Sequence, residues 1–378
     1  MPAIDAYLNE ILDKRGSDLH FIAGDPPRIR QYGDLMPLRP DKLDPTAVRE
    51  ALYEIMPKIA IDRFETKEGA DFAYTMAERG RFRVNVLRHL NGMGAVFRAI
   101  PSKALTMDEL KLPESVRQMC RHTQGLILVT GKTGSGKSTT LASLIDDINT
   151  RVQGHILTIE DPIEFVHVRK SCLISQREVG HHAPTFSAAL HSALREDPDV
   201  ILVGELRDAE TISMAMTAAE TGHLVFGTLH TTGAVKTIDR IIDALPVEER
   251  EQTKSFLAQS LLAVITQILV KSADARSRRA LCEIMVMTKA IAKLIQTDQT
   301  HQIPTQLQTG RDYGMQMLDQ ALLAAITAKE IDPDDAYAYA TEKRLFQKYV
   351  TDTSILPKLD SQGSSTRIGP GPSAPAAT

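Results

Sequence analysis

The segment TGKTGSGKSTT at residues 130–140 constrains the fold more than any other part of the chain. It fits the pattern G-x-x-x-x-G-K-[ST], with Gly131, Gly136, Lys137 and Ser138 at the fixed positions. Glycines without Cβ atoms let backbone N–H groups close around phosphate oxygens, and the lysine can reach the terminal phosphates. Such a loop requires a buried strand before it and a helix after it, and therefore a parallel α/β sheet.

The residues on either side of the loop supply that context. Residues 126–129 form a short apolar run, and apolar residues recur at helical spacing after the loop at Leu141, Leu144, Ile145 and Ile148. A glycine-rich turn with a chance lysine would not explain both flanks. We therefore predict a nucleotide site in which the Ser138 hydroxyl can ligate Mg²⁺. The predicted binding residues of the loop are Gly131, Lys132, Thr133, Gly134, Ser135, Gly136, Lys137, Ser138 and Thr139.

Composition is that of an ordinary soluble globular protein. The 378 residues are many for one domain, so two folded domains are expected. A formal net charge of −4 gives no general basic field, which argues against a general nucleic-acid binder. The apolar runs are shorter than the roughly 20 residues that cross a bilayer. Three widely spaced cysteines exclude a tetracysteine zinc site and suit a reducing cytoplasm.

Residues 1–100 have an α+β pattern. Apolar residues at helical spacing predict an amphipathic helix over residues 4–12. Further along, Phe82, Val84 and Val86 alternate with Arg81 and Arg83, so the arginines share one face of a strand. Asn91-Gly92 predicts a hairpin turn before the next strand. Spacing alone leaves open whether the arginine face is solvated or contacts an anion.

Three segments are predicted for the rest of the chain. Prolines bound a linker at 101–113, and residues 114–350 form the second domain. Within it we predict parallel strands at 126–130, 155–160, 199–204 and 223–229, and a helical region from 248 to about 350. The last segment, 351–378, is rich in Pro, Gly, Ser and Ala and is predicted to be disordered.

Carboxylates and histidines follow the predicted strands. Glu160, Asp161 and Glu164 follow one strand; Gly204 and Glu205 follow another, where an aspartate is usual. Mg²⁺ would then depend on Ser138, phosphates and waters. His223 and His230 bracket a third strand. A lone histidine is more often structural than catalytic, but one at a strand end can contact phosphate or orient a glutamate.

Four sequence blocks together resemble a known family. They are the phosphate loop at 130–140, TIEDPIEF at 158–165, LREDPDVILVGELRD at 194–208 and GHLVFGTLHTT at 222–232. The chain resembles the secretion-superfamily ATPases, which are hexameric motors of type IV pili and type II secretion. It is most similar to the twitching-motility (pilus retraction) ATPases of the PilT and PilU type. The resemblance extends from residue 16 to residue 323.

The resemblance implies a fold, a set of roles and a place of action. It implies a PAS-like N-terminal domain and a RecA-like ATPase domain in a homohexamer that binds ATP and Mg²⁺. The motor would act in the cytoplasm on an inner-membrane pilus platform, with no contact to nucleic acid. Glu164, Glu205 and His230 would be catalytic, and His223 would contact the nucleotide. Arg81, Arg83 and Arg98 would reach the nucleotide from the N-terminal sheet, and Arg195 and Arg240 are weaker candidates.

One segment and one single position depart from the family pattern. Retraction motors carry AIRNLIRE where residues 290–297 read AIAKLIQT, so Ala292, Gln296 and Thr297 replace charged residues. The helical spacing survives, and the change leaves open whether the chain is the principal retraction motor or an accessory one, beside a paralogous ATPase. The second departure is Lys132, where proline is common.

Three alternatives remain. An assembly or secretion ATPase is expected to have a tetracysteine module and a longer N-terminal region, and this sequence contains neither. A RecA-like nucleic-acid translocase is disfavoured by the near-neutral charge. A small-molecule kinase is disfavoured by the long C-terminal region without an evident acceptor site.

Overall fold

The computed structural model divides the chain into two compact units. The first comprises residues 1–269 and 280–317, and the second comprises 270–279 and the segment from 318 onward. The structure describes residues 2–31, 34–66, 69–76, 79–100, 104–274 and 277–357. Among these residues, no helix has both the length and the apolar character needed to cross a membrane.

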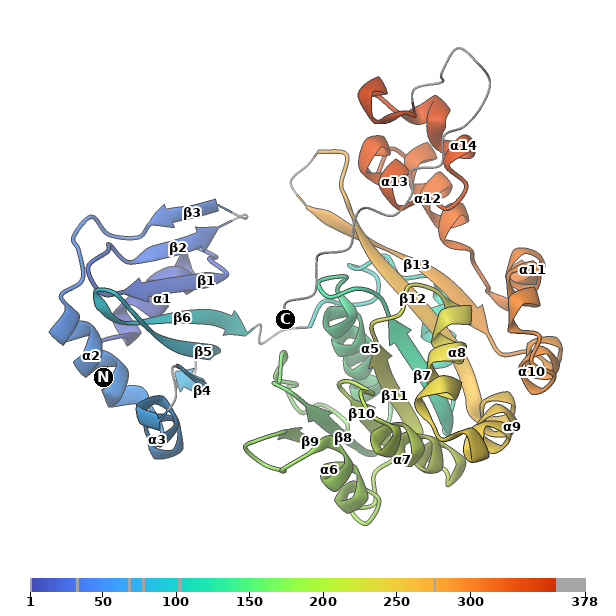
Figure 1. Cartoon of the computed structure of the whole chain (residues 1–378), viewed down its shortest axis with the longest axis horizontal. Coiled ribbons are helices and arrows are strands. Elements are labelled where there is room, and N and C mark those ends of the chain that lie inside the picture. Colours follow the sequence, from blue (N-terminus) through green and yellow to red (C-terminus); the bar gives the residue numbers. More distant parts are fainter. Residues whose placement is uncertain are drawn as a thin grey trace, which may run out of the picture. The chain divides into compact units, whose positions relative to one another are not determined.

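The N-terminal part of the first unit is a six-stranded antiparallel sheet with three helices (Figure 1). The strand order is β3-β2-β1-β6-β5-β4. Apolar residues of all three helices and of the sheet share one core, so the helices cover a single face. The elements are α1 (Asp5–Asp13), β1 (Asp18–Ile22), β2 (Arg28–Gln31), β3 (Asp34–Pro37), α2 (Pro45–Ile55), α3 (Lys58–Thr66), β4 (Gly69–Met76), β5 (Gly80–His89) and β6 (Gly92–Ile100).

The hairpin of β5 and β6 confirms the predicted period-two strand. Phe82, Val84 and Val86 are fully buried, while Arg83 between them is exposed. The strands pair antiparallel with His89 opposite Gly92, so the two-residue turn is Leu90-Asn91, one residue before the predicted position. Gly92 has a φ of 124°, a backbone conformation that favours glycine and explains why the glycine follows the turn.

The second part of the first unit is built on a seven-stranded sheet. Its order is β13-β12-β7-β11-β10-β8-β9, and the six strands from β12 to β9 are parallel. The predicted strands near 126, 155, 199 and 223 are confirmed as β7, β8, β10 and β11. The strand bounds are β7 (Gly125–Thr130), β8 (His155–Glu160), β9 (Leu173–Glu178), β10 (Val200–Val203), β11 (Leu224–Leu229), β12 (Leu261–Lys271) and β13 (Arg278–Val286).

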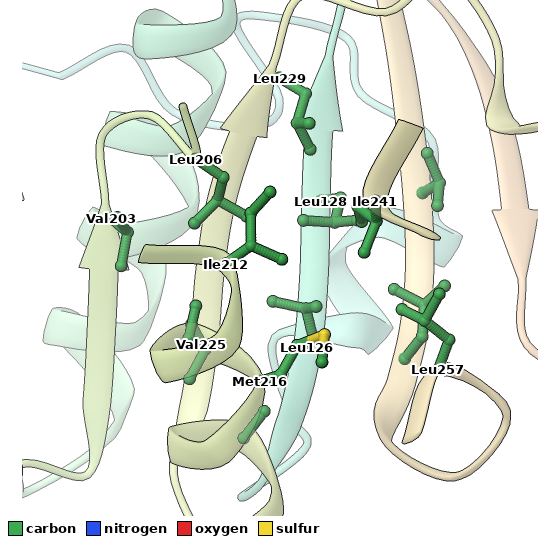
Figure 2. Packing of buried hydrophobic residues seen from close by; sticks show 14 of the residues in the cluster. Leu126, Leu128, Val203, Leu206, Ile212, Met216, Val225, Leu229, Ile241 and Leu257 are labelled. Carbon is green, nitrogen blue, oxygen red and sulfur yellow. The ribbon is translucent and has the colours of Figure 1, made fainter. Parts of the chain in front are cut away.

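Helices cover both faces of this sheet. Leu126 and Leu128 of β7 join the core beneath α6 to α10, whereas Ile127 and Val129 join the core beneath α4 and α5. Figure 2 shows the first of these cores, in which Ile212 and Met216 of α7 and Ile241 of α8 pack on the strands. Burial on both faces explains why the strands read as continuous apolar runs. The helices are α4 (Glu114–Met119), α5 (Lys137–Arg151), α6 (Phe186–Ala193), α7 (Ala209–Glu220), α8 (Ala234–Ala244), α9 (Arg250–Ser260), α10 (Lys289–Gln296) and α11 (Ile303–Thr309).

The predicted helical region from residue 248 onward is wrong in its middle part. The apolar segment at 261–271 forms β12, and 278–286 forms β13. Leu261, Val264 and Ile265 are fully buried between the two helical layers. A strand buried on both faces has no period of two, so its apolar run resembles a buried helix. The β-branched residues of the run were the signal that favoured a strand.

Beyond the strand ends that it includes, the described part of the second unit is mainly helical. Its helices are α12 (Leu318–Thr327), α13 (Pro333–Tyr339) and α14 (Lys343–Phe346). Aspartates connect them: Asp319 of α12 accepts hydrogen bonds from the backbone N–H groups of Thr341 and Glu342, and Asp332 caps α13. The predicted tail begins at residue 351 with a short 3₁₀ turn at Thr353–Ile355, and 358–378 lie outside the described residues, as do 101–103 of the predicted linker.

Candidate nucleotide-binding and catalytic site

The phosphate loop connects an interior strand of the parallel sheet to a helix. Strand β7 is buried along its whole length, and α5 begins at Lys137 directly after the loop. Gly131, Gly134 and Gly136 have φ values of 141°, 80° and 85°, in the region that favours glycine. No side chain caps the N-terminus of α5. Its first N–H groups and its dipole are therefore available to an anion.

Lys137 is held across this loop. Its Nζ donates to Gly131 O at 2.8 Å and lies 3.3 Å from Lys132 O. The lysine is 9% exposed. Burial lowers the pKa of the ammonium group, while the carboxylates of Glu205 and Glu164 act in the opposite direction. These contacts place one cationic group at the mouth of the glycine loop.

A cavity of about 430 Å³ lies beside the loop and is lined by the catalytic candidates. Lys137 and Ser138 line it from α5, Glu164 from the segment after β8, Glu205 from the segment after β10 and His230 from the segment after β11. The carboxyl ends of parallel strands meet at one edge of a sheet, which brings residues distant in the sequence together.

Both carboxylate oxygens of Glu205, which lines this cavity, have side-chain partners. His230 Nε2 lies 3.1 Å from its Oε1, and Arg207 Nε donates to its Oε2 at 2.7 Å. The preceding residue is Gly204, where a Cβ would lie 3.1 Å from Ile159 O and 3.3 Å from the Cα of Glu160. A larger residue at position 204 would therefore press closely on the backbone at the end of β8.

The segment after β8 presents two glutamates in different environments. Glu160 accepts hydrogen bonds from Thr158 Oγ1 at 2.7 Å and Gln176 Nε2 at 3.3 Å, and burial raises the pKa of its carboxyl group. Glu164 is exposed, and its backbone N–H donates to Glu160 Oε2 at 3.4 Å. Glu160 therefore supports the backbone that carries Glu164 into the cavity.

The two predicted histidines lie at opposite ends of β11. His230 follows the strand, with Nδ1 3.4 Å from Lys137 Nζ. His223 precedes the strand, its Nδ1 is 2.9 Å from Ala218 O, and its carbonyl accepts from the N–H of Gly125 at the start of β7. Six strand residues span about 20 Å. The structure therefore brings His230 to the phosphate loop and does not bring His223 there, because the strand holds the two residues apart; the expectation for His223 came from the family resemblance.

The arginines of the N-terminal sheet lie on neighbouring strands, with Arg83 of β5 opposite Arg98 of β6. Arg98 lines the cavity and its Nε donates to Asp18 at 2.8 Å. Arg81 donates to Glu178 at 3.2 Å, and Arg83 lies 4.0 Å from Asp71. Arg195 and Arg240 are exposed and are not among the residues that line the cavity.

Sequence reasoning missed Arg207 and Gln267. Arg207 contacts Glu205 and lies 3.6 Å from Asp161, so it links the segments that follow β10 and β8. Its place two residues after Glu205 was a usable signal, because alternate residues of an extended segment share a side. Gln267 lies beneath the phosphate loop on β12, in the segment that was predicted to be helical.

The site fits a nucleotide and leaves little protein ligation for a metal ion. The three positive-φ glycines and the uncapped helix suit phosphate oxygens. Among the residues that the structure describes, no group of three or more His, Cys, Asp or Glu side chains could hold a metal ion. The donor set fits Mg²⁺ bound mainly by phosphates and water, with the Ser138 hydroxyl in the cavity as the protein ligand.

Comparison with known proteins gives concordant matches. The profile of the family described as type II/IV secretion system protein matches residues 1–348. The type IV pilus retraction ATPase PilT of Pseudomonas aeruginosa is 50% identical over 320 residues, covering 85% of this chain and 93% of that protein. The type IV pilus ATPase PilU of the same organism is 36% identical over 364 residues, covering 96% and 94%. A crystal structure of the pilus retraction motor PilT with bound ADP superimposes with a TM-score of 0.85 at 38% identity, covering 91% and 98%.

Proposed function

Because this chain belongs to the type II/IV secretion system protein family, we propose that it is an ATP-hydrolysing motor that powers type IV pilus retraction. The observation that carries the proposal is the convergence of Lys137, Glu205 and His230 on one cavity beside a phosphate loop. The names of its relatives supply the direction of work, since one with 50% identity is a retraction ATPase.

The side chains divide the hydrolytic work between them. Lys137 and the N-terminus of α5 balance the charge of the phosphates, which is the main task in phosphoryl transfer. Glu205 orients the attacking water and accepts its proton, while His230 holds one carboxylate oxygen and lies beside Lys137. Glu164 approaches from the segment after β8. Mg²⁺ held at Ser138 would supply further charge neutralisation.

The higher-order assembly belongs to the same proposal. We assign a PAS-like character to residues 1–100 and a RecA-like character to residues 114–350, with 101–113 as the linker. Six copies would form a ring in the cytoplasm, at the inner-membrane face of the pilus machine, and would act on its platform protein. The antiparallel sheet with helices on one face and the parallel sheet with helices on both support these two assignments.

A shared site between neighbouring subunits can be tested by mixing. Lys137→Ala subunits and Arg81→Ala/Arg83→Ala subunits are each expected to be inactive. If the arginines of one subunit complete the site of another, mixed rings regain part of the ATPase activity, because some sites then contain both groups. Trans arginines contribute roughly 10³–10⁵ in rate where they act. Phosphate release is measured in rings whose mixing is verified by two affinity tags, and unmixed rings are the control. No recovery in verified mixed rings contradicts the shared site.

Deletion of the gene tests the direction of work and the choice between principal and accessory motor. Helix α10 forms over the altered segment with Ile291 and Ile295 buried, so the replaced charges affect the exposed face and not the fold. A face with fewer charges offers fewer polar contacts to a partner. Loss of all retraction upon deletion indicates a principal motor. If deletion weakens retraction under load but leaves unloaded retraction intact, the chain is an accessory motor. The substitutions Ala292→Arg, Gln296→Arg and Thr297→Glu are then expected to make it less dependent on the other motor.

The second candidate is a pilus-assembly or secretion ATPase. Two relatives carry names of type II secretion system proteins. The same deletion distinguishes it. If the deletion removes pili from the cell surface, the chain drives filament extension. If pili accumulate and do not retract, it drives retraction.

A further inference from the structure

Gln267 is a buried polar residue directly beneath the phosphate loop. It is 1% exposed and belongs to β12, which pairs in parallel with β7. The register places Thr266 opposite Thr130, the last residue of β7. Gln267 therefore follows the point at which β7 ends and the loop begins. A buried amide requires hydrogen-bond partners, because an unmade bond in the core is costly.

The side-chain amide of Gln267 connects two parts of the nucleotide site. Nε2 donates to Ser135 O at 2.6 Å, and Oε1 accepts from Thr140 Oγ1 at 2.6 Å. Ser135 belongs to the loop and Thr140 to the first turn of α5. All four atoms are buried. One side chain from a distant strand thus spans the junction between the loop and the helix.

Residue 267 also lies against two glycines of the sequence pattern, through its backbone carbonyl at one and its side chain at the other. A Cβ at Gly131 would lie 2.3 Å from Gln267 O, and one at Gly136 would lie 2.8 Å from Gln267 Nε2. By contrast, a Cβ at Gly134 would meet nothing within 4 Å, so that position needs glycine only for its backbone conformation. The two glycines at fixed positions are those that pack on Gln267.

We propose that Gln267 is a positioning residue that sets the orientation of the Ser135–Gly136 peptide and so turns the Gly136 N–H toward the phosphates. The peptide bond is trans, and in a planar trans peptide the carbonyl and the following N–H point in opposite directions. A carbonyl held beneath the loop by Gln267 leaves the N–H on the upper side. The amide is suited to this task, since it can donate to a carbonyl and accept from a hydroxyl at the same time.

The contact to Thr140 extends the same control to α5. Thr140 N donates to Gly136 O at 3.0 Å, so Thr140 belongs to the turn that starts the helix. Its hydroxyl bond to Gln267 Oε1 fixes that turn relative to β12. The N–H groups at the helix start and the Gly136 N–H are then presented together. The inference rests on the proposed use of this loop for ATP and is independent of what the motor pulls.

Gln267→Met is the first test, because methionine has a similar volume and makes neither bond. ATP affinity is measured by titration calorimetry on the full chain, together with KM and kcat. We expect Kd and KM to rise about 10- to 100-fold, as the buried hydrogen bonds to Ser135 O and Thr140 Oγ1 are lost, while kcat changes less than about threefold. Gln316→Met is the matched control, since Gln316 is a partly buried glutamine that donates to Cys282 O at 2.8 Å outside the loop. Wild-type affinity in Gln267→Met overturns the proposal.

Gln267→Glu is the second test and gives a pH signature. An ionised carboxylate still accepts from Thr140 but repels Ser135 O, whereas the protonated acid can donate to it. Burial disfavours the ionised form, so protonation falls within reach of mild acid. Relative to wild type, ATP affinity is expected to recover between about pH 8 and about pH 6 and to exceed that of Gln267→Met at the lower value. A pH-independent ratio overturns the donor role.

The two arms separate this inference from the proposed function. If wild type failed to bind ATP in the same titration, the nucleotide assignment itself would be lost. If wild type binds ATP and both variants bind it as tightly as wild type at every pH, only the role of Gln267 is lost. Should Gln267→Met fail to fold, as judged by circular dichroism, the pH series of Gln267→Glu carries the test.

Discussion

Replacing Lys137 with alanine is expected to abolish Mg²⁺-dependent ATP hydrolysis, with a loss of about 10²–10³-fold or more. The ammonium group is buried and oriented by Gly131 O at 2.8 Å, and no other lysine of the described residues lines the cavity. Its removal leaves the charge of the terminal phosphates without this cation in the transition state. Phosphate release by the purified full chain at saturating ATP measures the effect.

A surface lysine of the same unit provides the control for this loss. Lys170 is exposed and pairs with Asp146 at 2.8 Å, away from the cavity. Exposed pairs of this kind contribute little to stability, so Lys170→Ala is expected to keep activity within about twofold. Wild-type turnover in Lys137→Ala would show that the phosphate site lies elsewhere.

Glu205→Gln is expected to separate binding from turnover. The amide can replace the carboxylate sterically but has little basicity, so kcat is expected to fall about 10²–10⁴-fold while ATP affinity changes only a few-fold. Glu164→Gln is also expected to lower kcat with little change in ATP affinity, because Glu164 lines the same cavity. Titration calorimetry gives the affinity, and single-turnover hydrolysis gives the chemical step.

The control for the glutamates is Glu248→Gln, an exposed residue of the short 3₁₀ turn after α8 that does not line the cavity. It is expected to leave both affinity and turnover unchanged. Normal hydrolysis by Glu205→Gln or by Glu164→Gln would remove that residue from the catalytic assignment.

In this structure both carboxylate oxygens of Glu205 have cationic or hydrogen-bonding partners. Arg207 occupies one and His230 the other. A base must present an oxygen to the water from which it takes a proton. In the proposed role, the water would use a remaining lone-pair site of Glu205, since each carboxylate oxygen has two. Arg207 is the more exposed partner, with a side chain 55% exposed against 46% for His230, and it also faces Asp161 at 3.6 Å.

The sequence was sufficient for those features that short-range patterns determine. The strand, loop and helix around residue 130 follow from local composition, and so does the alternation of Phe82, Arg83 and Val84. The prediction was wrong for β12, because a strand covered on both faces has the same apolar pattern as a buried helix. The environment of such a run depends on distant segments that local patterns do not contain.

The same reasoning applies to the site. Lys137 and Glu205 could be located because each follows a recognisable apolar strand. Gln267 could not, since its importance depends on the register between β12 and β7, which places it under Ser135. His223 shows the opposite case: the family resemblance implied a contact with the nucleotide, but His223 lies at the end of β11 that is remote from the phosphate loop.

The interior place of β7 in the sheet has a consequence for how the protein opens and closes locally. Hydrogen bonds tie this strand to β12 on one side and β11 on the other, and all six of its residues are buried. Exposing its amides to solvent exchange requires breaking both ladders and two cores, which approaches global unfolding. Strand β9, at the sheet edge, has one such neighbour and several half-buried residues. Backbone amides of β7, the strand before the phosphate loop, are thus expected to exchange slowly. Amides of β9, the edge strand beside the Glu164 segment, are expected to exchange through sub-global opening.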